Sequence, residues 1–422
     1  MSQTDFRRFV PTPEHSKVHG ETARKHAENM SKVTLIKNIF DNWQEMFAAP
    51  FRGITTNGEI IPNLFRLRSE RAPVEQAIIV TNQLMTKLTP EQSVSCCFDI
   101  DSNQWRNWQN TEIYVEDFGL RLCEVNATVR EAVIEILRAC LGPKGYQKTR
   151  DVMRFNGFLG ELVGGPDILG EFTYLFCLFG KPSKTEPWGW QLFGHHLCLN
   201  CMMLGDQMTI TPTFMGGEPC FADTGPLKGI RLFEDEERHG LKLMQSFSKK
   251  QQKQARIAHS MVDGDLPEGR RSRHDGLHLG GAYYDNRIIP LEGLKGSDFT
   301  KLQKCNLIDL MANYMGTLPK GPFETKMIDI DRYFAETHFC WIGGQEENQP
   351  FYYRIQSPIT LIEFDHHAGV FLNNPEPENF HIHTLVRTPN GNDYGIDLIR
   401  QHYENSPHHK DHQHARILKK KP

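Results

Sequence analysis

The chain has 422 residues, 39% of them hydrophobic, with 48 basic and 52 acidic residues and a formal net charge of −4. This length can bury a sizeable core in one large domain or two. The near balance of charge predicts no nucleic-acid partner, and the lack of an apolar run of about 18 residues predicts no membrane partner. Ten cysteines without an apolar leader indicate reduced thiols and a cytoplasmic protein.

The N-terminal part has helical periodicity. We expect an N-terminal arm over residues 1–20, followed by helices over 21–49 and 73–87. Thr128 and Glu131 have the spacing of a capping box, which predicts the start of a third helix at that point. A helical pattern resumes over 146–156.

Residues 188–219 change to the period of a β-strand. The expected strand 188–200 places His195 on the face of Leu197 and Leu199, and His196 on the opposite face with Cys198 and Asn200. The face with two leucines is the better core candidate, so His196 is favoured for a polar site. His195 is then a core histidine or a residue that orients a ligand. A turn at Leu204–Asp206 leads into a second strand, whose glycines bring Glu218 near this hairpin, although a surface turn is an equal alternative.

The middle of the chain predicts a charged helix over 233–261 and a helix capped by Ser297 or Asp298. The glycine-rich segment 262–284 between them favours a surface loop, with a mobile loop over a site as the alternative. Two further strands are expected over 352–364 and 381–388. We expect residues 21–403 to form a single large domain, with a possible sub-boundary near 160–185. The tail 404–422, rich in histidine and lysine, is expected to be disordered.

The segment 381–387 carries the clearest functional pattern. Alternation places His381, His383 and Arg387 on one face of the strand and aliphatic residues on the other. Glu363 and Asp365 share a face of the preceding strand, and Tyr352 shares a face with Arg354. The alternative for an isolated His-x-His is two satisfied histidines on a half-exposed strand. The second histidine cluster at 195–196 favours a functional site.

Together these clusters predict a metal centre. His196, His381 and His383, with His195, supply nitrogen ligands. Glu363, Asp365 or Glu218 supplies an oxygen ligand, and Glu363 or Glu218 is the expected general base. Nitrogen-rich ligation favours iron or copper, with zinc as the alternative. Arg387 is expected to fix an anionic substrate, and the residues expected to bind a small-molecule substrate are Arg354, Gln191 and Tyr352.

Three functions fit this pattern. The leading hypothesis is an oxidoreductase or oxygenase acting on a small polar or carboxylate-bearing molecule at a mononuclear site. A zinc-dependent hydrolase and a non-catalytic ligand-binding protein are the alternatives. A nucleophilic Cys198–histidine pair is less favoured. The chain lacks His-Glu-x-x-His, Gly-x-Ser-x-Gly and Walker-type motifs.

The expected fold is α+β, with a helical N-terminal portion packed against a largely antiparallel sheet that carries the histidine-rich strands. Four strings carry a family resemblance: WGWQLFGHHL from Trp188, TPTFMGGEP from Thr211, FYYRIQSP from Phe351 and HIHTLVRTPNGNDYG from His381. On these strings the chain resembles a bacterial and fungal family catalogued as domain-of-unknown-function family 3500. The resemblance implies that the histidine clusters recur in relatives, and it implies no reaction.

Overall fold

The computed structural model describes residues 5–114, 117–262, 264, 266, 269–272 and 275–405. Most of its helices and strands fall into two successive halves. The elements of the first half are α3 (Val74–Met85), α4 (Pro90–Cys96), β1 (Cys97–Phe98), β2 (Leu120–Arg121), α5 (Ala127–Cys140), α6 (Pro143–Val163), β3 (Tyr174–Phe179), β4 (Trp188–Gly194), β5 (Leu197–Leu204) and β6 (Gln207–Gly217).

The second half begins after residue 233. Its elements are α7 (Glu234–Ser246), α8 (Lys249–Ala255), β7 (Arg256–Ala258), β8 (Leu294–Lys295), α9 (Lys301–Met315), α10 (Lys320–Arg332), β9 (His338–Gly343), β10 (Phe351–Gln356), β11 (Leu361–His367) and β12 (Glu378–Arg387). Outside the two halves lie α1 (Ala23–Ser31), α2 (Thr34–Ala48) and α11 (Ile396–Asn405).

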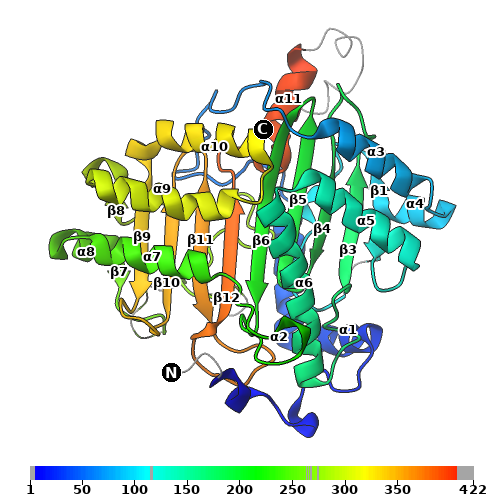
Figure 1. Ribbon diagram of the computed structural model, residues 1–422, viewed down its shortest axis with the longest axis horizontal. Coiled ribbons are helices and arrows are strands. Elements are labelled where there is room, and N and C mark those ends of the chain that lie inside the picture. Colours follow the sequence, from blue (N-terminus) through cyan, green and yellow to red (C-terminus); the bar gives the residue numbers. More distant parts are fainter. Residues whose placement is uncertain are drawn as a thin grey trace.

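All these strands join one 12-stranded sheet in the described part of the chain, in the order β1-β3-β4-β5-β6-β12-β11-β10-β9-β7, with β2 on β3 and β8 on β9 (Figure 1). The pairing is antiparallel except where β1 meets β3 and β7 meets β9. The chain is therefore an α+β protein with a largely antiparallel sheet, as the sequence predicts.

The two halves repeat one topology. Each has two helices, a short strand parallel to the outermost long strand, a second short strand, two more helices and a four-stranded antiparallel meander. The meanders meet where β6 pairs with β12, for example Phe214 with Leu385 and Gly216 with His383. The halves are joined by residues 218–233, whereas residues 160–185 run from the end of α6 through β3 and lie inside the first half. One continuous sheet spans both.

The sheet is covered on both faces. Helices α5, α6, α7 and α9 cover the face seen in Figure 1, where Leu159, Leu243 and Leu310 are buried against the strands. We call the other side the loop face. It is covered by α2, α11 and irregular segments, which bring Trp43, Tyr283 and other aromatic residues onto Phe214 and Leu385. Because both faces are buried, polar residues on the loop face lie in the interior and need internal partners.

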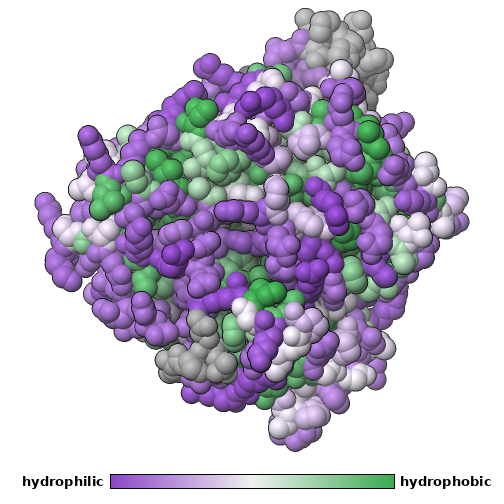
Figure 2. Space-filling model, in the orientation of Figure 1, coloured by the Kyte–Doolittle hydropathy of each residue, from purple (hydrophilic) through white to green (hydrophobic). Residues whose placement is uncertain are grey.

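The surface seen in Figure 2 is mostly hydrophilic, with hydrophobic side chains in separate patches. No helix among the described residues is long and apolar enough to cross a membrane. All ten cysteines lie in the described ranges and are free thiols. The tail 406–422 and the loop residues Arg273 and His274 lie outside the described residues.

Several element boundaries differ from the sequence-based expectation. The helix expected over 21–49 is two helices, because Val33 takes an extended conformation. Helix α5 is capped by Asn126, whose side chain accepts from Val129 N, and not by Thr128. Helix α9 is capped by Thr300, in a capping box with Gln303. The segment 233–261 contains two helices and the strand β7.

Two expected strands are hairpins. Residues 188–200 form β4 and β5, with His195 and His196 as the turn between them, and residues 352–364 belong to β10 and β11. His196 has a φ of 61°, in the left-handed region that non-glycine residues seldom occupy. The two turn positions carry no glycine, proline or asparagine, and Gly194 just before them indicates only a bulge, so alternation alone does not predict the turn.

A candidate metal centre

Three histidines meet where the β4–β5 turn lies beside β12. His196 is in the turn, and His381 and His383 are two residues apart on β12, on the loop face. Strand β6 connects the two places, because Met215 pairs with Leu197 and Gly216 pairs with His383. The strand order thus brings together residues that are 185 positions apart in the chain.

Their Nε2 atoms converge. His381 Nε2 lies 3.0 Å from His383 Nε2 and 3.3 Å from His196 Nε2. All three side chains are buried, and their ligand atoms lie within 4.8 Å of one another. Imidazole nitrogens bound to one tetrahedral ion at about 2.0–2.1 Å are separated by about 3.3 Å. The spacing therefore fits a single transition metal ion.

The protonation of the cluster supports the same fit. Burial, with the neighbouring imidazoles, holds the pKa of each of these histidines well below the usual range, so the rings are neutral near pH 7. The in-plane position of His381 Nε2 holds either one proton or one lone pair, so this atom cannot make a linear hydrogen bond to both neighbouring Nε2 atoms at once. Among the described residues, Nδ1 of His381 and of His383 also lacks a hydrogen-bond partner. A cation bound by the three Nε2 atoms would use their lone pairs and leave the ring protons on Nδ1.

Gly216 makes room for the cluster. A Cβ atom at this position would lie 2.9 Å from His383 Cδ2 and 3.0 Å from His196 Cδ2. Real Cβ atoms seldom come that close to another heavy atom, so an alanine would push the imidazoles apart. The glycine is therefore part of the site, although it supplies no ligand.

His195 lies behind the triad. Its ring is 3.8 Å from the His196 ring, and its Nδ1 is 2.7 Å from Asn156 Oδ1. Burial lowers its pKa to about 4, so the ring is neutral. His195 is not one of the three converging ligands, and its contacts position His196.

Glu218 lies on the Nδ1 side of His381, at 3.7 Å. Its carboxylate accepts from the backbone N–H groups of Val370, Phe371 and Leu372. Burial raises its pKa to about 7. The residue ties the β11–β12 loop to the site and can orient His381, which is how carboxylates commonly support metal-binding histidines.

The structure adds His367, His278 and Asp275 to this site, and it places the candidate oxygen ligand Asp365 beside His383. Asp365 pairs across the strands with His383, and the His367 ring lies 4.4 Å from that of His383. His278 Nε2 is 3.4 Å from Asp365 Oδ1, and Asp275 lines the same cavity as His383. Alternation through Glu363, Asp365 and His367 could have placed His367 on this face. Asp275 and His278 had no such signal, because the segment reads as a glycine-rich surface loop and is in fact buried.

Glu363, Tyr352 and Arg354 form a separate group on the same face. Glu363 accepts from Tyr352 Oη at 2.6 Å and from the backbone N–H groups of Leu279 and Gly280. Arg354 donates to Glu292 and to Pro290 O. These contacts hold the buried loop on the sheet.

Arg387 and Gln191 also contact protein groups. Arg387, fully buried, donates to Asp285, Asp393 and Gly280 O. Gln191 donates to Trp105 O and Asn200 Oδ1. Cys198 accepts from Asn200, and burial raises the pKa of its thiol far above the usual range, which makes it a poor nucleophile.

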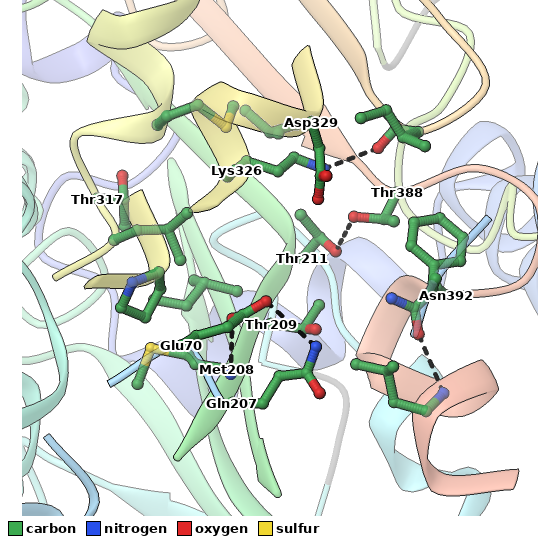
Figure 3. Close-up of a pocket in the computed structure, with 18 of the residues that line it drawn as sticks. Glu70, Gln207, Met208, Thr209, Thr211, Thr317, Lys326, Asp329, Thr388 and Asn392 are labelled. Carbon is green, nitrogen blue, oxygen red and sulfur yellow. Dashed lines mark hydrogen bonds between the residues drawn. The ribbon is translucent and has the colours of Figure 1, made fainter. Parts of the chain in front are cut away.

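A second cavity, of about 90 Å³, lies on the helix-covered face. Its lining mixes polar and apolar side chains. Among the polar ones, Glu70 contacts Gln207 and Met208 N, Thr211 contacts Thr388, and Lys326 donates to Ile359 O (Figure 3). None of the three histidines lines it.

The fold and these contacts define an α+β protein with a candidate metal centre at the junction of two equivalent halves. A family model described as "Protein of unknown function (DUF3500)" matches residues 70–396, and the chain belongs to this family. The match includes both halves of the sheet and all three histidines. No curated protein and no solved structure matches the chain.

Proposed function

We propose that this protein is a metal-dependent enzyme, an oxidoreductase, with one iron or copper ion held by His196, His381 and His383. The observation that carries the proposal is the convergence of three buried Nε2 atoms, two pairs of them at 3.0 and 3.3 Å. Three neutral imidazoles suit iron, copper or zinc and leave coordination positions open for substrate. The free thiols favour a cytoplasmic location.

The chain's own residues would orient the ligands and move protons. Bound there, iron or copper would supply one-electron chemistry, and zinc would supply a more acidic water. His195 and Glu218 position His196 and His381. His367 donates from Nδ1 to Ala368 O, at 2.8 Å, which leaves Nε2 with a lone pair that can accept a proton near the triad.

A zinc hydrolase is the second candidate, and Asp275 favours it. This buried carboxylate lines the cavity that reaches His196 and His383, and its Oδ2 has no hydrogen-bond partner among the described residues. Burial raises its pKa to about 7, which suits a general base near neutral pH. The metal found in the protein separates this candidate from the oxidoreductase.

The test is elemental analysis of the full chain beside a His381→Ala/His383→Ala variant. The tail histidines are present in both proteins, so the difference reports the site. We expect about one equivalent of metal fewer in the variant, with iron or copper supporting the oxidoreductase and zinc the hydrolase. The control is His338→Ala, which removes a histidine outside the triad and should keep the parent's metal content.

Circular dichroism shows whether each variant folds. If the double variant does not, His196→Ala provides a second test, because it changes the β4–β5 turn and leaves β12 intact. Equal metal content in parent and folded variants, after reconstitution with iron, copper and zinc in turn, would refute the proposal. It would leave a histidine-lined binding pocket.

A further inference from the structure

A cavity of about 240 Å³ extends from the surface to the triad. Its inner wall contains His195, His196, His383 and Asp275. His383 is on β12, and His195 and His196 form the turn between β4 and β5, so this end of the cavity is part of the sheet. This cavity gives a molecule a path to the proposed metal ion.

The opposite wall is apolar. It is built mainly from one side of α2, with Ile113 and Phe371 completing it; the α2 residues are Leu35, Ile36, Ile39, Phe40 and Trp43. Phe371 also packs edge-on against His195, with ring centroids 5.3 Å apart. The second cavity, with its glutamate, lysine and threonines, differs clearly in chemistry (Figure 3).

Charged groups line this cavity mostly in pairs or at fixed contacts. His26 Nε2 is 3.1 Å from Glu112 Oε1, and Lys17 Nζ donates to Val370 O at 2.6 Å. Asp275 also lines the cavity, together with His195, His196 and His383. Its carboxylate is buried, and Oδ2 has no hydrogen-bond partner among the described residues. A molecule in the cavity would therefore meet the aliphatic and aromatic side chains of α2, the paired groups His26 and Glu112, and the imidazoles and Asp275 beside the triad.

We infer that the substrate is an amphiphile: an apolar ring or chain that lies along α2 and ends in a polar group beside His196, His383 and Asp275. This inference rests on the proposed metal site and replaces the small polar substrate expected from the sequence. The size agrees, because a cavity of about 150 Å³ holds benzene, and 240 Å³ leaves room for a substituted ring.

The test compares two metal-binding probes on the cobalt-loaded full chain: imidazole and 4-phenylimidazole. Each reports its binding through the visible spectrum of cobalt, and they differ by an apolar ring. Burying a phenyl ring against α2 is worth about 1.5–3 kcal/mol, so 4-phenylimidazole should bind at least about tenfold more tightly. The same titration is repeated with Ile36→Ser, which removes part of the apolar wall.

The matched control is Ile328→Ser, on the exposed surface of α10, where the side chain is 62% exposed. We expect Ile36→Ser to reduce the preference for 4-phenylimidazole several-fold without changing imidazole affinity or cobalt content, and Ile328→Ser to change none of these. Equal affinity of the two probes, or a preference that Ile36→Ser leaves intact, would overturn the inference while the metal site stands. A chain that binds no cobalt at the triad would refute both.

Discussion

At the scale of single residues, the site depends both on its nitrogen ligands and on the absence of a side chain at Gly216. His196, His381 and His383 supply nitrogens, while Gly216 supplies space between them. His195 and Glu218 hold two of the imidazoles in place. Such supporting groups usually matter nearly as much as the ligands for metal affinity.

Gly216→Ala tests this role. The new Cβ would lie within about 3 Å of two imidazole carbons, and the rings would have to separate. We expect metal affinity to fall about 10- to 100-fold, the usual range for losing a supporting contact. The measurement is competition with a chromophoric chelator. Gly264→Ala, at a position where a Cβ meets nothing within 4 Å, is the control and should bind metal like the parent. Unchanged affinity in Gly216→Ala would show that the triad tolerates the extra atom.

The sequence singled out His381 and His383 because alternation on a strand is a local property. The same reasoning favoured His196, although that residue lies in a turn. It could not assign Arg387, Arg354, Gln191 or Tyr352 to their neighbours, because their partners come from distant segments. Asp285 and Asp393, for example, reach Arg387 from the buried loop and from the segment after β12.

At the scale of elements, the buried segment 275–285 connects the site to the sheet. At the start of this segment, Asp275 and His278 face the site. At its end, Asp285 pairs with Arg387 on β12 and with Arg106 in the short 3-10 helix Asn103–Arg106. The loop backbone also donates to Glu363 and Asp365 on β11. A glycine-rich segment read as a surface loop is thus a buried layer of the protein.

Arg387→Met should therefore be costly. The substitution removes the ion-pair partner of buried Asp393 and one of the two ion-pair partners of Asp285, and breaking a buried pair in this way costs about 3–5 kcal/mol. The free energy of unfolding by urea measures the effect. Arg400→Met removes a partly exposed guanidinium from its pairs with Asp397 and Glu404, and should cost less than about 1 kcal/mol. Similar losses in both variants would mean that the buried network contributes no more than a surface pair.

At the scale of the whole molecule, the repeated topology explains where the site lies. Two similar halves place their last strands, β6 and β12, side by side, and the triad forms at one end of that junction. The second cavity lies beside the same two strands, since Thr211, Val386 and Thr388 line it. The residue pattern did not reveal the duplication, because the two halves share topology without an evident repeat in sequence.

Lys326 in the second cavity gives the stability of the whole molecule a predictable pH dependence. Burial lowers its pKa from 10.5 to about 8. Between these values the unfolded chain binds more protons than the folded one, so this residue makes the protein more stable as pH rises from 8 to 10.5. The lysine stem is partly exposed, so we expect a gain of about 1–2 kcal/mol at most.

The measurement is the free energy of unfolding of the parent minus that of Lys326→Met between pH 7 and 10.5. The difference should become more favourable to the parent across that range. Lys295→Met, at an exposed lysine, is the control and should show no such trend. If the difference in free energy of unfolding between the parent and Lys326→Met does not change with pH, the ammonium of Lys326 is not desolvated.

Local patterns were enough to predict the α+β class, the largely antiparallel sheet, most helices and the family, because periodicity and short motifs involve residues close together in the chain. The sequence also drew attention to three histidines that meet in space. The tertiary structure decided that His195 and His196 form a turn, that residues 275–285 are buried, and that Arg387 is held by two aspartates. These outcomes depend on which strands and loops, distant in the chain, pack together, and no local sequence pattern predicts that packing.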